Sequence, residues 1–600
     1  MRNNFVSPLL AALLLLIPLV SVTFAAEQTI KALNPRGYRP EVQLKPLAER
    51  QTDLNNKSLY LVTSKQEGSH IEVVLAKVAE ALTKRFPNVK IVNKYKPSAY
   101  MSDDPELWAE MTKNAQAFVY GAAPSCSTTH WDTTWTALLE RKGLPGVVVI
   151  YDTLIDTAKM TAEEKGVPVR WVPVSYPPQK MTEKQMAEAT DKVIKALITP
   201  LSDNEKKTGK YTPPKPPKYA PTGTYTQVQE YFLKEGWTDG LPIIPPTQER
   251  VAAMLKGTKH KPDEVVGTTV WPEKWTATVE KVAINAVMAG CRPEYMPVLL
   301  ATVEAWAKWD NDSTIRSTNS FSYMQIVNGP IRNEIGMNSG IYAMGPGNQA
   351  NASIGRALRL FITNLGGGQA GVNMMGTQGN PSAYSFCIPE NEEASPWPPL
   401  SADMGYKAGE STVTIFSGGW CHVGNYLNGN LDSLVRAIRY FEWPNGVVLL
   451  MAPQAAKLQV AKGNDKNAVK DYIWKNATLT MKEWKSDVYY DWFIEPALKG
   501  KAQYGIKDLW PKEYLGLPDD AVIRPYPRKN IHLVVVGGET NPMMQGWRFA
   551  YPPRPLWING GKQFISQTRR GWLHDHRLGF RRFFVTNGHQ ALKKGKGCRQ

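Results

Sequence analysis

The chain has 600 residues, which at roughly 100–200 residues per domain is too long for a single domain. Its 42% hydrophobic and 21% charged residues exclude a wholly disordered, collagen-like or coiled-coil protein. The formal net charge is +17, but residues 569–600 hold nine Lys or Arg against one Asp. The rest of the chain lacks the clustered basic and aromatic residues of a nucleic-acid-binding face, so we expect no nucleic-acid partner.

The N-terminus has the three-part pattern of a secretory signal peptide. Arg2 supplies the positive charge, residues 9–22 form an apolar run, and residues 23–25 offer a small-residue cleavage site. We therefore predict a signal peptide over residues 1–25 and export of the mature chain, to the periplasm; an uncleaved membrane anchor is the alternative. After this segment is removed, no apolar stretch is long enough to span a membrane.

The five cysteines are widely spaced and include no Cys-x-x-Cys pair. This spacing excludes a zinc ribbon and a thioredoxin-type motif, and the odd number leaves at least one thiol unpaired within the chain. One or two disulfides stay open, because spacing alone does not assign them.

Short apolar strands alternate with helical patterns over residues 57–200, after an extended polar lead-in at residues 27–56. Strands are predicted at residues 58–63, 89–92, 117–120 and 146–150, and helices at residues 71–86, 107–114, 131–142 and 181–197. Continuous apolar strands between helices are typical of a parallel sheet that is covered on both faces. We therefore predict a three-layer α/β domain with a parallel sheet.

A Pro-rich segment at residues 201–224 is predicted to be a semi-rigid linker between two domains. Residues 225–565 are predicted to form a larger α/β domain with a mixed sheet. Its helices are expected at residues 226–235, from 248, 276–290, 297–309 and 351–365, and its strands at 321–327, 411–416, 446–451 and 532–536. Residues 566–600 lose this periodicity and are predicted to be a disordered basic tail.

Residues 121–130, Gly-Ala-Ala-Pro-Ser-Cys-Ser-Thr-Thr-His, connect the third predicted strand to a helix expected to begin near Trp131. Ligands of parallel α/β sheets bind at the carboxyl ends of strands, and a helix N-terminus stabilises a thiolate. Cys126 is therefore a candidate nucleophilic or redox thiol. Its candidate partners are Ser125, Thr128 and His130. The alternative is a small buried cysteine beside a hydroxyl N-cap.

The third strand, this loop and the continuation at residues 134–149 resemble the UGSC (seleno)protein family, which carries selenocysteine or a substitute, then Gly-Ser-Cys, in this loop. Ser125 and Cys126 match the Ser-Cys of that motif, whereas Ala123 falls on the selenocysteine position and Pro124 on the glycine. No selenylsulfide or disulfide can therefore form within the loop. Redox cycling would need another partner for Cys126.

The second predicted domain carries further motifs that resemble the same family. They lie at residues 239–247, 278–295, 328–332, 351–360 and 386–397. The activity of the family is poorly defined, so the resemblance implies kinship rather than a particular reaction.

Clustered carboxylates in the second domain are the other candidates for chemistry. Glu390, Glu392 and Glu393 flank Asn391, and such carboxylates raise one another's pKa and serve in acid/base catalysis or metal binding. Glu390 and Glu392 are our candidate catalytic residues, and a solvated acidic loop is the alternative. The candidate substrate-binding residues are Asp239, Arg292, Asn328, Arg332 and Asn391; the two arginines could hold a carboxylate.

Cys387, Cys421 and His422 are candidate ligands of a soft metal, although their spacing is not diagnostic. No motif requires a cofactor, and a metal stays open. The chain lacks the Gly-x-Ser-x-Gly, His-Glu-x-x-His, EF-hand and kinase signatures, which argues against the common hydrolase, zinc-protease and nucleotide-dependent classes.

Together these features predict an exported small-molecule enzyme that uses Cys126 in redox, nucleophilic or lyase chemistry, at a site between two α/β domains. Two other classes stay open. One is a periplasmic binding or assembly protein without turnover, which Ala123 favours, and the other is a metal-dependent lyase or hydrolase of the second domain. The expected partner is a small-molecule substrate; its identity, the reaction and any homo-oligomer are left open.

Overall fold

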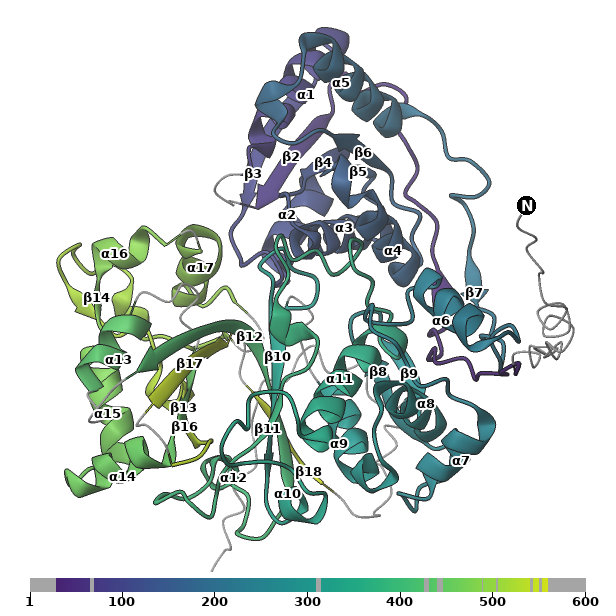
Figure 1. The fold of residues 1–600 in the computed structure, drawn as a ribbon. Helices are drawn as coiled ribbons and strands as arrows, with labels where there is room; N and C mark the ends of the chain where they lie inside the picture. The colour runs from purple at the N-terminus through teal and green to yellow at the C-terminus, as the bar shows by residue number, and fades with distance from the viewer. Residues whose placement is uncertain are drawn as a thin grey trace, which may run out of the picture. The chain divides into compact units, whose positions relative to one another are not determined.

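The computed structural model describes residues 28–558 except 65–68, 309–313, 426–430, 440–445, 488, 503–505, 540–542 and 550–552. The predicted signal peptide at residues 1–25 and the predicted basic tail at residues 566–600 lie outside the described residues. Within the described ranges, no helix is long and apolar enough to cross a membrane. Helices and strands are mixed along the whole described chain, as expected for an α/β protein (Figure 1).

The N-terminal part of the chain is built on a five-stranded sheet in which every strand pair is parallel. The spatial order is β3-β2-β4-β5-β6. The strands are β2 (Ser58–Ser64), β3 (Lys90–Lys96), β4 (Ala117–Gly121), β5 (Gly146–Tyr151) and β6 (Trp171–Val174). β5, with the sequence Gly-Val-Val-Val-Ile-Tyr, is buried at every position, as expected for a strand covered on both faces.

Helices cover both faces of this sheet (Figure 1). α1 (Ile71–Arg85) and α5 (Glu183–Ile198) pack on one face, and α2 (Pro105–Asn114), α3 (Cys126–Arg141) and α4 (Ile155–Lys165) pack on the other. Each face has its own cluster of buried apolar side chains. The predicted parallel α/β architecture is confirmed.

Two local details differ from the sequence prediction. α3 begins at Cys126 rather than near Trp131, because Ser125 has the extended backbone of an N-cap and the Thr128 hydroxyl donates to the Ser125 and Ala123 carbonyls, both at 3.0 Å. α4 and β6 were not predicted: α4 is rich in polar residues, and β6 has only four residues, one of them a proline.

The segment before the parallel sheet pairs with the Pro-rich segment. β1 (Val42–Leu44) runs antiparallel to β7 (Gly209–Tyr211), and isolated bridges join Ile30 to Gly223 and Leu33 to Tyr219. The Pro-rich residues are therefore held by main-chain hydrogen bonds, whereas a free spacer would have none. The domain boundaries proposed from the sequence stay a prediction.

The C-terminal part is built on a mixed seven-stranded sheet, as predicted. Its order is β11-β10-β12-β17-β13-β16, and β18 also pairs with β12. The β10–β11 and β13–β16 pairs are parallel, and the other pairs are antiparallel. The strands are β10 (Ser322–Asn328), β11 (Cys387–Pro389), β12 (Thr412–Asn425), β13 (Val447–Met451), β16 (Ile531–Val535), β17 (Met543–Phe549) and β18 (Arg554–Trp557).

The remaining elements surround this sheet or connect to it. The longer helices are α6 (Tyr225–Lys234), α7 (Gln248–Leu255), α8 (Val279–Ala289), α9 (Met296–Ala307), α11 (Gln349–Asn364), α13 (Leu431–Ile438), α14 (Pro453–Ala461) and α15 (Lys466–Asn476). The shorter helices are α10 (Ile331–Glu334), α12 (Leu400–Asp403), α16 (Met481–Lys485) and α17 (Glu495–Leu498). Two short antiparallel pairs join β8 (Val265–Val270) to β9 (Trp275–Thr278) and β14 (Leu479–Thr480) to β15 (Val522–Ile523).

A buried polar cluster lies at the carboxyl edge of the parallel sheet, where the strand order reverses beside β2. Ser64 and Lys96 end β2 and β3, Tyr120 comes from β4, and Asp132 comes from α3; all four side chains are buried. Lys96 Nζ donates to the carbonyls of Ala99 at 2.7 Å and Ser102 at 2.6 Å. Burial lowers the pKa of Lys96 to about 7 and raises the pKa of Asp132 to about 8.

The raised pKa of Asp132 predicts a pH dependence of stability. Between pH 3.8 and about pH 8 the folded state keeps a proton that the unfolded state has lost, so this carboxyl lowers stability as pH rises, by up to about 1.4 kcal/mol per pH unit. Asp132→Asn removes this loss. We therefore expect the variant to gain stability over the wild type progressively from pH 4.5 to pH 7.5, measured as the difference between their thermal midpoints.

Asp203→Asn, at an exposed carboxylate, is the matched control and should leave the pH profile of the thermal midpoint unchanged. A constant difference between Asp132→Asn and the wild type across this pH range would show that Asp132 is ionised in the folded protein.

Candidate functional site

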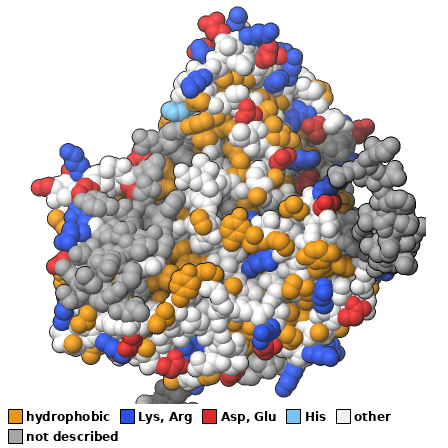
Figure 2. Space-filling model, in the orientation of Figure 1, with side chains coloured by type: hydrophobic (Ala, Val, Ile, Leu, Met, Phe, Trp, Pro, Cys, Tyr) orange, Lys and Arg blue, Asp and Glu red, His pale blue; other side chains and the backbone are white. Residues whose placement is uncertain are grey.

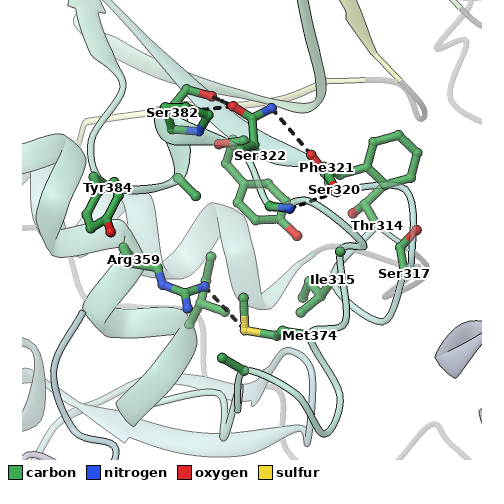
Figure 3. Close-up of a pocket in the computed structure, with 18 of the residues that line it drawn as sticks. Thr314, Ile315, Ser317, Ser320, Phe321, Ser322, Arg359, Met374, Ser382 and Tyr384 are labelled. Carbon is green, nitrogen blue, oxygen red and sulfur yellow. Dashed lines mark hydrogen bonds between the residues drawn. The ribbon is translucent and has the colours of Figure 1, made fainter. Parts of the chain in front are cut away.

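A cavity of about 680 Å³ opens beside the start of β10. Its walls are residues 314–323, one side of α11, and the loop at residues 370–386 (Figure 3). This volume is in the usual range for small-molecule sites. On the face shown in Figure 2, charged side chains lie mostly towards the edges, whereas the area over β10 and α11 is mainly hydrophobic and uncharged.

The long loop is fastened to the opposite wall through Ser320. The Ser320 hydroxyl accepts hydrogen bonds from the backbone N–H groups of Gln378 at 3.1 Å and Gly379 at 3.0 Å. Asn380 donates to the carbonyls of Ser320 and Gly419. Gly376 allows this close approach, because a Cβ there would lie 2.7 Å from the Ser320 Cα. Hydrogen bonds between side chains and the main chain therefore hold the cavity walls together.

Two arginines of α11 face this region, and they differ in their partners. Arg356 binds the carboxylate of Asp239 through Nε at 2.7 Å and Nη2 at 2.9 Å, which neutralises the acidic group of the cavity wall. Arg359 lies one helical turn further on and donates to the sulfur of Met374 at 3.3 Å (Figure 3). Burial lowers the pKa of Arg359, while Tyr323, Asp239 and Tyr384 act in the opposite direction.

The structure brings together the candidate residues Asn328, Arg332, Glu390 and Glu392. The Asn328 amide donates to Glu390 at 2.7 Å and to Glu392 at 3.0 Å. Arg332 donates to the Glu390 carbonyl at 2.6 Å and forms an ion pair with Glu393 at 3.0 Å. Burial raises the pKa of Glu390, and Arg332 holds the pKa of Glu393 at about 2. These groups bond one another, except that Asn328 Oδ1 has no hydrogen-bond partner within the described residues, and they do not line the cavity.

Three further candidate substrate-binding residues of the second domain lie outside this network of Asn328, Arg332 and the glutamates, or only at its edge. Asn391 donates to the Gly537 carbonyl at 3.0 Å and so joins the 390–393 loop to the segment after β16. Arg292 is largely exposed and its nearest carboxylate is Glu294, at 3.9 Å. Asp239 lines the cavity, but its carboxylate is occupied by Arg356.

The candidate metal ligands are only partly described. Cys387 begins β11 and is a buried thiol, and burial raises its pKa. Cys421 and His422 occupy adjacent positions of β12, and their side chains lie outside what the structure describes. In the described part of the chain, no group of three or more His, Cys, Asp or Glu is placed to hold a metal ion. The metal prediction for these residues stays a prediction.

Cys126 is the first residue of α3 and directly follows the loop that leaves β4. The placement at a helix N-terminus and at the carboxyl edge of the sheet agrees with the position predicted for it. Its side chain has no exposed surface and packs with the apolar cluster under α1 and α5. The Ser125 and Ser127 hydroxyls bond to each other at 3.0 Å.

His130 connects α3 to the C-terminal part of the chain. Its Nδ1 bonds the Thr161 hydroxyl of α4 at 2.9 Å, and Arg316 Nη1 donates to the ring, 2.7 Å from Nε2. Burial and the charge of Arg316 hold the pKa of His130 well below its usual value, so the imidazole is neutral. The structure places His130 on the side of α3 that contacts Arg316.

Arg316 extends this contact into a buried network of charges. Its Nη2 donates to Glu273 at 2.7 Å and to Glu164 at 3.4 Å. Burial favours protonation of Glu164, but Lys165, Lys274 and Arg316 outweigh it and hold the pKa of Glu164 well below its usual value. The network therefore holds α3 and α4 to residues 272–274 and 316.

The sequence did not reveal the charged residues whose side chains are largely buried in the fold. Arg359 and Arg316 have no sequence signature, because an arginine in a polar pattern is usually a solvated residue. Lys96 offered a weak signal, since it follows the strand predicted at residues 89–92, near the sheet edge where ligands bind.

Residues 31–203 match the profile of the UGSC family, and this range contains the complete parallel sheet. No curated protein matches the chain. The match does not extend to residues 225–565, so the resemblance of the motifs there stays a prediction. Residues 31–203 are therefore similar to the UGSC family, in agreement with the resemblance of the Ser-Cys loop.

Proposed function

We propose that the chain is an enzyme that acts on a small organic molecule bound in the cavity between residues 314–323, α11 and residues 370–386. The observation that carries this proposal is the cavity itself, which at about 680 Å³ has room for a small organic substrate. Its lining is mainly apolar, with a few polar groups that would orient a ligand.

Two hydroxyls of the cavity wall support a ligand in this position. The oxygens of Thr314 and Ser322 are buried and have no hydrogen-bond partner within the described part of the chain. Buried polar atoms are rarely left unsatisfied in folded proteins, so these hydroxyls are suited to bond a polar atom of the substrate.

The sequence at the N-terminus also indicates where the enzyme acts in the cell. The signal-peptide pattern of residues 1–25 favours export, and we propose that the mature enzyme works in the periplasm.

Ala370→Trp tests the cavity as the substrate site. Ala370 is exposed and lines the cavity, so a tryptophan there should obstruct it without disturbing the core. In a screen of small organic molecules against the wild type, compounds that raise the thermal midpoint should lose at least tenfold in affinity for this variant. Mass spectrometry of the same compounds, incubated with the wild type, should show that at least one is consumed.

The matched control is Ala252→Trp, an exposed alanine on α7 that is outside the cavity, and it should bind like the wild type. Equal binding to Ala370→Trp and the wild type would place the ligand elsewhere. Binding in the cavity without consumption would favour the alternative of a binding protein without turnover.

Thiol chemistry at Cys126 is the second candidate, and one observation favours it. Cys126 is the first residue of α3 at the carboxyl edge of the parallel sheet, where the helix N-terminus favours a thiolate. In this proposal Ser125, Thr128 and His130 are its neighbours, and Glu390 and Glu392 supply acid/base groups from the second domain. Because Cys126 is completely buried, the reaction requires local movement that exposes its sulfur.

Cys126→Ser tests the thiol proposal. If the sulfur reacts with substrate, this variant should lose turnover by at least a hundredfold while keeping its thermal midpoint, and N-ethylmaleimide should label Cys126 faster than Cys291 or Cys387 in the wild type. Burial raises the pKa of Cys291 to about 12, so Cys291 is expected to be the slow-reacting reference. Cys291→Ser is the control and should keep full turnover.

Full turnover in Cys126→Ser would remove the thiol from the mechanism and leave the cavity proposal unchanged.

A further inference from the structure

Arg359 is the unpaired cation of the cavity. It lies on α11 next to Arg356, but the two arginines have different surroundings. Arg356 forms an ion pair with Asp239 through Nε and Nη2, and its Nη2 also donates to the carbonyls of Leu241 and Pro242. The guanidinium of Arg359 points towards Met374 on the opposite wall (Figure 3). It donates to the sulfur of Met374, which is a weak acceptor.

A guanidinium carries five N–H donors, and this one has only that single hydrogen bond within the described part of the chain. None of the ion pairs among the described residues includes Arg359. Protein atoms shield most of the Arg359 guanidinium from solvent, and this burial lowers the pKa of Arg359. A largely buried charge without a counterion is unfavourable, so an anion that enters the cavity would gain a strong charge-assisted partner.

The other residues that line the cavity indicate the chemical character of the rest of such a ligand. Leu358, Ile362, Met375 and Phe386 are apolar, and Tyr384 is half exposed. Asp239 adds no free negative charge, because Arg356 neutralises it. The cavity thus offers one positive charge in an otherwise uncharged and mostly apolar space, which suits a monoanion better than a doubly charged phosphate.

We propose that Arg359 binds the carboxylate of a small organic acid whose apolar body fills the cavity. The planar guanidinium and carboxylate can pair through two parallel hydrogen bonds, and the hydroxyls of Thr314 and Ser322 bond further polar atoms of the acid. This inference rests on the proposed function, since it names the substrate class of the same cavity.

The test uses the full-length mature protein and three probe acids, benzoate, phenylacetate and 4-methylpentanoate, each with its neutral primary amide. Affinity is measured by calorimetric titration. At least one acid should bind the wild type at least tenfold more tightly than its amide. Arg359→Gln should lose at least tenfold in affinity for that acid and keep the affinity of the amide, and Arg359→Lys should retain part of the acid binding.

Lys308→Gln is the matched control, because it removes one positive charge from an exposed side chain outside the cavity. It should bind the acid like the wild type. A second readout needs no variant: phenylglyoxal modification of Arg359, mapped by mass spectrometry, should be slowed by the acid and not by the amide.

The outcomes separate this inference from the proposed function. Acids and amides that bind equally, with Arg359→Gln unchanged but Ala370→Trp impaired, would keep the cavity as the substrate site and overturn the carboxylate assignment. Acid binding that is lost in Arg359→Gln but unaffected by Ala370→Trp would contradict the cavity as the site of turnover. The absence of acid binding, together with unprotected Arg359, would also overturn the carboxylate assignment.

Discussion

The guanidinium of Arg316 is buried where three separate segments of the chain meet. It reaches His130 on α3, Glu164 on α4 and Glu273 after β8, and only 1% of its surface is exposed. A buried charge is tolerated only when it is paired, so these partners must come together for the folded state to form. Removing the arginine would leave the buried Glu273 carboxylate without its ion-pair partner, which costs more than the lost contact alone.

The need to pair Arg316 also affects the cavity, because Arg316 lies within the segment that forms one of the cavity walls. Thr314, Ile315 and Ser317, which flank it in sequence, line the cavity wall. The loop on the other side is tied to α4, because the Thr157 hydroxyl donates to the Val372 carbonyl at 2.5 Å. Both walls are therefore positioned by contacts to the helices of the parallel-sheet region. The cavity consists of loops whose geometry depends on a rigid scaffold, which is the common arrangement for binding sites.

The sequence predicts structural features that depend on a local pattern of residues. It does not predict features that depend on how distant parts of the chain pack together. The apolar run at residues 146–150 indicated a buried strand. The sequence pattern did not show that Asn328 and Arg332 bond Glu390, because residues far apart in the chain meet there only in the fold. The helix α3 begins earlier than its pattern predicts, because the Thr128 hydroxyl in its first turn bonds backbone carbonyls that the pattern does not show. Arg359 and Arg316 were missed, since only the fold buries them.

The two functional proposals share one residue, Met375. Its side chain lines the cavity and also packs against the apolar cluster that contains Cys126. The Thr157 hydroxyl lies 4.0 Å from its sulfur, so α4 also contacts this part of the wall. Methionine is flexible and fills irregular space, and its movement requires less rearrangement than that of a branched side chain. Met375 is therefore a side chain of the wall through which a change in the cavity can reach the apolar cluster that contains Cys126.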